Sequence, residues 1–162
     1  MTEFHELYSR YAGDIYRFAL SMCGDAAEAE DIAAETFARA LTGKAPLVSA
    51  TVKGYLLTIA RNLFLESVRR RKRQSELPLE IPDSSPNFAH VFSHRTELEA
   101  VQAYLQTIPE VDRAALLLRV DGVTYVEIAN VLNISLASAK VKVHRLRLKL
   151  AEWRVNRELE KT

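Results

Sequence analysis

The stretch TYVEIANVLNISLASAKVKVHRLRLKL, residues 124–150, decides the fold of the C-terminal part of the chain. Thr124 and Glu127 have the spacing of a capping box, in which each side chain satisfies an exposed backbone N–H of the other residue, so a short helix begins there. Asn133 tolerates the left-handed conformation that ends a helix, and Ser135 is a suitable N-cap for the next one. The stretch therefore predicts a helix-turn-helix.

The second of these helices has an apolar side and a cationic side. Apolar residues step along the inward side by three and four, and five basic residues lie on the outer face: Lys140, Lys142, Arg145, Arg147 and Lys149. A cationic face on a helix that packs against a core suits the major groove of DNA. One outer stripe is formed by Lys140, Val141, His144 and Arg145, at i, i+1, i+4 and i+5. Lysine and arginine can donate to guanine and valine can contact a thymine methyl, so side chains at this spacing are chemically able to contact base edges. Lys142 lies on its flank.

Upstream of residue 124, apolar residues recur every three or four positions, the period of amphipathic helices, and no stretch alternates as a strand would. The apolar series run over 4–22, 29–41, 55–67, 98–108 and 114–118. Gly24 ends the first helix, Asp25 is a plausible N-cap for the second, and Gly43 stops it.

Pro78, Pro82 and Pro86 break the helical pattern between the third and fourth of these series. Prolines around a polar centre favour an extended tether, so we expect a flexible linker over 77–96, open to proteases, that lets its two sides move independently. The fold class we predict is all-α, with two small helical domains over 1–76 and 97–162, the second containing the helix-turn-helix.

Charge alternates along the chain although the net charge is only +1. Residues 53–76 and 136–162 each carry a net charge of +5, whereas 1–52 carry −4 and 77–135 carry −5. The two basic segments suggest two surfaces that bind a polyanion. One cysteine excludes an internal disulfide, and the chain has neither an export signal nor a long apolar run, so we expect a cytoplasmic protein without membrane insertion.

Three stretches resemble regions of the extracytoplasmic-function sigma factors of bacterial RNA polymerase, in that family's order. The resemblance is carried by AEAEDIAAETFARAL (27–41), YLLTIARNLFLESVRRRKR (55–73) and the run from 105 to 150. They resemble the core-binding region, the minus-ten helix and region four. The chain departs from the family's usual residues at Ala34 for Gln, Tyr55 for Trp, Glu66 for Asp, and Ser138-Ala139 for Thr-Val.

The resemblance implies a non-enzymatic subunit that binds core polymerase and promoter DNA. The residues it places at the minus-thirty-five element are Ser138, Lys140, Val141, Lys142, His144 and Arg145. Those it places at the minus-ten element are Arg61, Asn62, Glu66, Arg69 and Arg70, helped by a loop over 44–51 that captures a flipped base. Glu28, Asp31 and Glu35 form an acidic face that would dock on the coiled coil of the largest-subunit clamp. An anti-sigma factor is a further expected partner.

Two other functions remain open on the residues alone. A response-regulator-type transcription factor could carry the same helix-turn-helix, but its receiver domain would alternate strands with helices. A helical metalloenzyme could use the acidic face, although di-metal sites usually add a Glu-x-x-His pair, which this chain lacks. His90 and His94 stand at i, i+4 without an evident third ligand. We therefore expect no catalytic residue, no bound metal and no cofactor.

Overall fold

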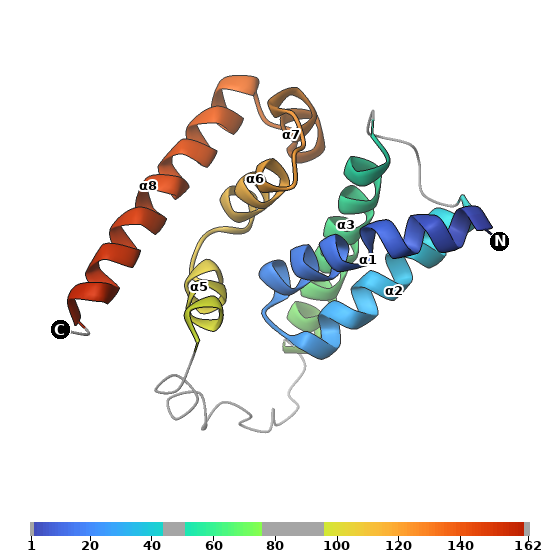
Figure 1. The fold of residues 1–162 in the computed structure, drawn as a ribbon, viewed down its shortest axis with the longest axis horizontal. Coiled ribbons are helices and arrows are strands. Elements are labelled where there is room, and N and C mark those ends of the chain that lie inside the picture. The colour runs from blue at the N-terminus through green and yellow to red at the C-terminus, as the bar shows by residue number, and fades with distance from the viewer. Residues whose placement is uncertain (1, 44–50, 76–95, 161–162) are drawn as a thin grey trace.

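The computed structural model describes residues 2–43, 51–75 and 96–160. The described residues form helices joined by short turns and contain no strand, which confirms the all-α prediction. The helices are α1 (Thr2–Cys23), α2 (Ala26–Thr42), α3 (Val52–Ser75), α5 (Glu97–Leu105), α6 (Glu110–Val120), α7 (Tyr125–Leu132) and α8 (Leu136–Glu160) (Figure 1). The predicted linker and His90 and His94 lie outside the described residues, apart from Thr96, the N-cap of α5.

The first domain is a three-helix unit formed by α1, α2 and α3. Gly24 has φ 73° and its N–H donates to the Leu20 carbonyl at 2.7 Å, which ends α1 where the sequence predicts it. Asp25 caps α2, because its Oδ1 accepts the Glu28 N–H at 3.1 Å, and Gly43 closes that helix at φ 67°. Phe18, Phe37 and Leu56 are among the fully buried side chains at the centre. Helices alone in the described part of this domain do not make a receiver domain, so the response-regulator alternative is wrong.

The second domain contains the predicted helix-turn-helix. The Glu127 N–H donates to Thr124 Oγ1 at 3.2 Å, Asn133 adopts φ 55°, and Ser135 Oγ accepts the Ser138 N–H at 3.0 Å. Beyond the turn α8 continues for 25 residues. The ring of Trp153 stacks on that of Tyr104 with centroids 5.0 Å apart, so the C-terminal half of α8 is held against α5.

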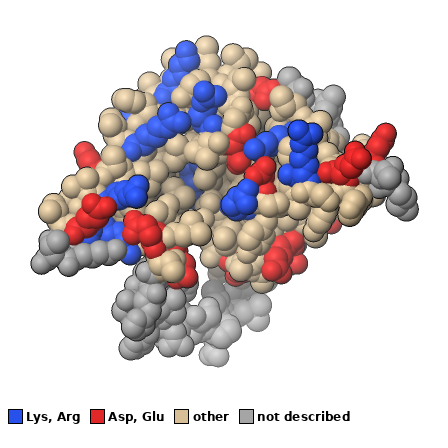
Figure 2. All heavy atoms as spheres, viewed as in Figure 1, with Lys and Arg blue, Asp and Glu red and all other residues tan. Residues whose placement is uncertain are grey.

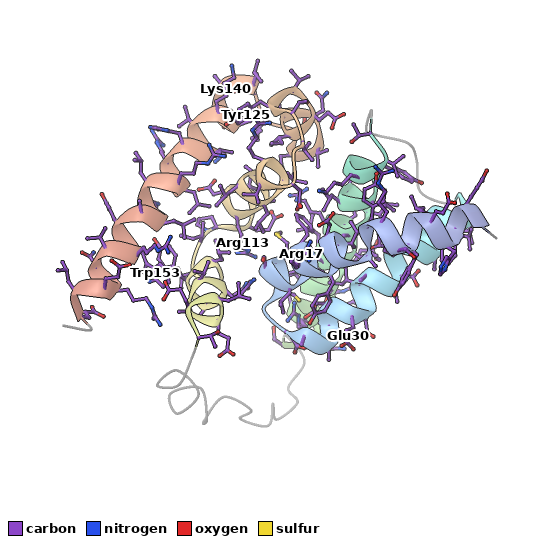
Figure 3. The ribbon with its side chains drawn as sticks, in the orientation of Figure 1. Arg17, Glu30, Arg113, Tyr125, Lys140 and Trp153 are labelled. Carbon is purple, nitrogen blue, oxygen red and sulfur yellow. The ribbon has the colours of Figure 1, made fainter. Side chains whose placement is uncertain are left out.

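The two domains pack against each other, with α5 and α6 lying between α8 and the helices of the first domain (Figure 1). Arg113 of α6 lies at the centre of this contact (Figure 3). Its side chain donates to the carbonyls of Leu105, Ile108 and Met22 at 3.3, 2.6 and 2.9 Å, so it joins the α5–α6 turn to the end of α1. We expected the two domains to move independently, whereas in this structure they are packed against each other.

Candidate nucleic-acid interface

The recognition stripe of Lys140, Val141, His144 and Arg145 is exposed along the outer side of α8. Val141 is 43% exposed, which is a large fraction for a valine in a helix that packs against a core. The opposite side of the helix is buried through Ala139, Val143 and Leu146. Because three buried residues fix the rotation of α8, the two cations, the imidazole and the valine methyls all face solvent. Figure 2 shows basic side chains gathered along α8 on this face of the molecule.

Two further residues assigned to the minus-thirty-five element are partly engaged within the domain. Ser138 is half-buried beside the N-cap. Lys142 points toward α6, where its Nζ donates to Asp112 Oδ1 at 2.8 Å. Lys142 therefore lies on the flank, as the sequence predicts, and its charge is offset by a carboxylate. Arg145 lines a small hollow of about 100 Å³ beside this pair.

On α3, the structure brings three of the five predicted minus-ten residues to the surface. Asn62, Arg69 and Arg70 are exposed. Glu66 is half-buried, and its Oε2 lies 3.4 Å from a guanidinium nitrogen of Arg39 on α2. The loop that we expect to capture a flipped base spans residues 44–51. Of these residues, the structure describes only Thr51.

Arg61 departs from the predicted basic face. It is only 9% exposed, and its Nε and Nη2 donate to the two carboxylate oxygens of Glu110 at 2.7 and 3.0 Å. Two parallel bonds of this kind are the strongest geometry for an arginine and a carboxylate. Arg61 therefore does not share the exposed face of Arg69 and Arg70, because α6 covers that side of α3, and its contact with the minus-ten element stays a prediction.

The acidic residues of α2 line an open groove between α2 and α3 with a volume of about 730 Å³. Asp31 and Glu35 are exposed on one wall, and Arg70 and Arg71 form part of the other. Glu28 is not available in the same way, since its Oε1 accepts bonds from Ser67 Oγ at 2.5 Å and from Arg71 at 3.3 Å. Sequence reasoning missed this pairing across two helices. Asp31 and Glu35 stay exposed, although Glu35 Oε1 accepts a bond from Arg39 Nε on the same helix at 3.2 Å.

Within the described ranges, no three side chains of histidine, cysteine, aspartate or glutamate lie close enough together to hold a metal ion. Of the helices that the structure describes, none combines the length and the apolar composition needed to cross a bilayer.

Comparison with known proteins places the chain in a family. The Sigma-70 region 2 model matches residues 7–74, and the Sigma-70, region 4 model matches residues 98–150. The chain is 34% identical over 160 residues to the ECF RNA polymerase sigma factor SigE of Mycolicibacterium smegmatis, covering 94% of this chain but 62% of that protein. It is also 34% identical over 148 residues to the ECF RNA polymerase sigma factor SigM of Bacillus subtilis, covering 90% of this chain and 91% of that protein.

A solved structure shares the fold. The chain superimposes on the sigma factor RpoE from Bartonella quintana, crystallised with the anti-sigma factor NepR, with a TM-score of 0.72 at 22% identity, over 94% of this chain and 96% of that one. Two family matches in the order region 2, region 4, and similarity over 90% of this chain and 91% of SigM, agree with the helix-turn-helix and with the three-helix first domain. The chain therefore belongs to the extracytoplasmic-function RNA polymerase sigma factors of the Sigma-70 family.

Proposed function

We propose that this sigma factor, acting in the cytoplasm and without catalytic activity of its own, directs core RNA polymerase to promoters through two DNA-binding surfaces. The domain over 97–162 reads the minus-thirty-five element with the recognition stripe of α8. The domain over 1–76 binds the minus-ten element with the exposed face of α3, and 77–96 connect them. The observation that carries the proposal is the stripe itself: side chains able to read bases face solvent on a helix whose rotation is fixed by a buried side.

Core polymerase is the second partner we propose, bound through Asp31 and Glu35 at the α2 wall of the groove. Exposed carboxylates can dock on the basic coiled coil of the clamp in the largest polymerase subunit, and opposite charges across an interface guide association. An anti-sigma factor is a further proposed partner, by analogy with the complex in which RpoE from Bartonella quintana was crystallised.

Charge reversal on the acidic face tests the docking surface. The double variant Asp31→Lys/Glu35→Lys should compete for core polymerase about 10- to 100-fold less well, because like charges placed opposite each other cost several kcal/mol. The measurement is competition with a labelled parent protein for core. Glu3→Lys/Glu6→Lys on α1 makes the same change in net charge at exposed positions away from the groove and should compete normally. Equal competition by both variants would show that docking uses another surface.

Arg145 and Lys142 allow base reading to be separated from phosphate binding. Arg145→Ala should change the preferred minus-thirty-five sequence, since a bidentate contact with guanine contributes about 1–3 kcal/mol of discrimination. Lys142→Ala should mainly lower the affinity for all sequences and reduce the salt dependence, because a phosphate contact carries no sequence information. Transcription in vitro from a promoter library randomised at this element measures both effects. Identical preferences for parent and Arg145→Ala would leave Arg145 as a phosphate contact.

A further inference from the structure

The outer side of α8 carries a second stripe beyond the recognition stripe, and this one is apolar. Leu148, Val155 and Leu159 are each more than half exposed, and Ala151 is exposed between the first two. Spacings of three and four residues place them on one side of the helix. We call these four residues the tail stripe. An open hollow of about 400 Å³ lies in its middle, lined by Ala151, Glu152, Val155 and Asn156.

The tail stripe faces away from the rest of the described structure. On the opposite side of α8, Trp153 stacks on Tyr104 of α5, and Arg157 Nε donates to Glu97 Oε2 at 3.2 Å. These contacts fix the rotation of the C-terminal half of the helix. In Figure 1, α8 forms the left edge of the molecule, with α5 and α6 on its inner side. A second helix can therefore lie along the tail stripe without displacing any described helix of this chain.

The tail stripe matches a second copy of itself that runs in the opposite direction. In a symmetric antiparallel pair centred on position 153, Leu148 of one copy lies beside Leu159 of the other, and Ala151 lies beside Val155. Each of these pairs lies at nearly equal distances before and after the centre. Val155 of each copy then fills the hollow at Ala151 of the other, as a knob fills a hole. In a parallel pair Ala151 would face its own copy, and the hollow would stay unfilled.

The charges that border the tail stripe favour the same register. Arg147 and Glu158 are exposed and stand about three turns of helix apart, on one border of the stripe. The antiparallel register sets Arg147 of each copy beside Glu158 of the other, so each dimer contains this contact twice. Charge complementarity of this kind fixes register and orientation. Near the centre, Glu152 lies close to its own copy, an unfavourable contact that a variant can remove.

We propose that the tail stripe is a self-association surface on which two copies of this chain pair in antiparallel orientation. The contact spans about 20 Å of helix, from 147 to 159, at 1.5 Å per residue. One side of so short a helix buries less than the roughly 800 Å² per partner of a standard interface. We therefore expect a weak dimer, with a dissociation constant on the order of 10–100 µM.

The dimer would also compete with promoter DNA for one side of α8. Leu148 lies four residues after His144 and seven after Val141, so the tail stripe continues the recognition stripe on the same side. A second molecule bound there would block the approach of a duplex. This consequence rests on the proposed function, whereas the pairing of the two copies does not depend on it. Adding a minus-thirty-five duplex should therefore convert the dimer to monomers bound to DNA.

Sedimentation equilibrium of the full chain measures the pairing. Arg147→Glu and Glu158→Arg should each weaken the dimer about tenfold or more, because like charges then meet twice, and the combined variant should regain the parent affinity. Val155→Asp should abolish the dimer. Val120→Asp, at an exposed position on α6, makes the same substitution away from the tail stripe and should leave the dimer unchanged. Circular dichroism checks that each variant keeps its helices.

Two further experiments test the direction of pairing. Glu152→Gln should tighten an antiparallel dimer, because it removes the repulsion near the centre. In a parallel pair Glu152 would face Arg147 of the other copy, and the same change would weaken the dimer. In a Cys23→Ser background, equal amounts of Ala151→Cys and Val155→Cys protein should form mainly the mixed 151–155 disulfide in air, which mass spectrometry separates from the two homodimers.

The outcomes separate self-association from the proposed function. A parent that stays monomeric at about ten times the expected dissociation constant would overturn the proposal and leave the tail stripe to a different protein partner. A dimer that Val155→Asp leaves intact, or disulfides in the ratio of random collisions, would also overturn it. A dimer that persists on bound DNA would overturn the competition. If the chain pairs as expected but no form of it binds promoter DNA or supports transcription with core polymerase, the proposed function fails and the self-association surface stands.

Discussion

Replacing Arg113 with alanine is expected to lower the free energy of unfolding by about 3–5 kcal/mol, because truncating one buried partner leaves the groups it satisfied without hydrogen bonds. Arg113 is 5% exposed and donates to three carbonyls, two in its own domain and one on α1. Burial lowers the pKa of its guanidinium, but an arginine remains protonated, so a buried cation is held here by carbonyl oxygens.

Urea denaturation followed by circular dichroism measures this effect, and Arg119→Ala is its matched control. Arg119 lies on the same helix, donates to the Val123 carbonyl at 3.2 Å and sits over the ring of Tyr125 at 4.7 Å, but it is only half-buried. Its removal should cost about 1 kcal/mol, the usual net contribution of a hydrogen bond. Equal losses for the two variants would mean that the three carbonyls are satisfied by water when Arg113 is absent.

The second large effect is expected from Ile128→Ala in α7. Ile128 is 0% exposed, and removing three buried carbons from a core leaves both a lost transfer free energy and a cavity, together about 2–5 kcal/mol. Because α7 has only eight residues and packs against α8, we expect the lost contacts of Ile128 to disturb the position of α8. We therefore expect both a lower urea midpoint and weaker binding to a minus-thirty-five duplex, while binding to minus-ten DNA is retained.

Val126→Ala provides the comparison within the same helix. Val126 is 59% exposed, so its truncation should change stability by less than about 0.5 kcal/mol. Fluorescence anisotropy with the two duplexes reports the affinities. A parallel loss of binding to both elements by Ile128→Ala would show that the two domains unfold as a single unit.

The helix ends could be predicted from the sequence because the chemistry that sets them is local. Asp25, Thr124 and Ser135 each accept a hydrogen bond from the N–H three residues ahead, so a few neighbouring residues contain all the necessary information. The left-handed residues Gly43 and Asn133 are equally local. The rotation of α8 follows from the spacing of its apolar residues, so the exposed side of that helix could be predicted before its neighbours were known.

The partners of Arg61 and Glu28 could not be predicted in this way. Arg61 pairs with Glu110 across 49 residues and Glu28 with Ser67 across 39, and helical spacing reports only which side of a helix is polar. An arginine among basic neighbours is consistent both with a phosphate and with a carboxylate on another domain. One local signal did exist at Arg113, which directly precedes the buried pair Ala114 and Ala115 and lies three residues before buried Leu116. A charged residue on an apolar face indicates a buried polar contact.

Gly24 is constrained in two ways, by its backbone conformation and by a side chain packed against it. Its positive φ disfavours any side chain, and a Cβ there would lie 3.0–3.1 Å from Cδ and Cγ of Gln106, the residue that donates to the Ser21 carbonyl. Every glycine codon is one nucleotide away from codons for alanine and valine. A single nucleotide change at this codon would therefore disturb the contact between α5 and α1 without altering any charged residue.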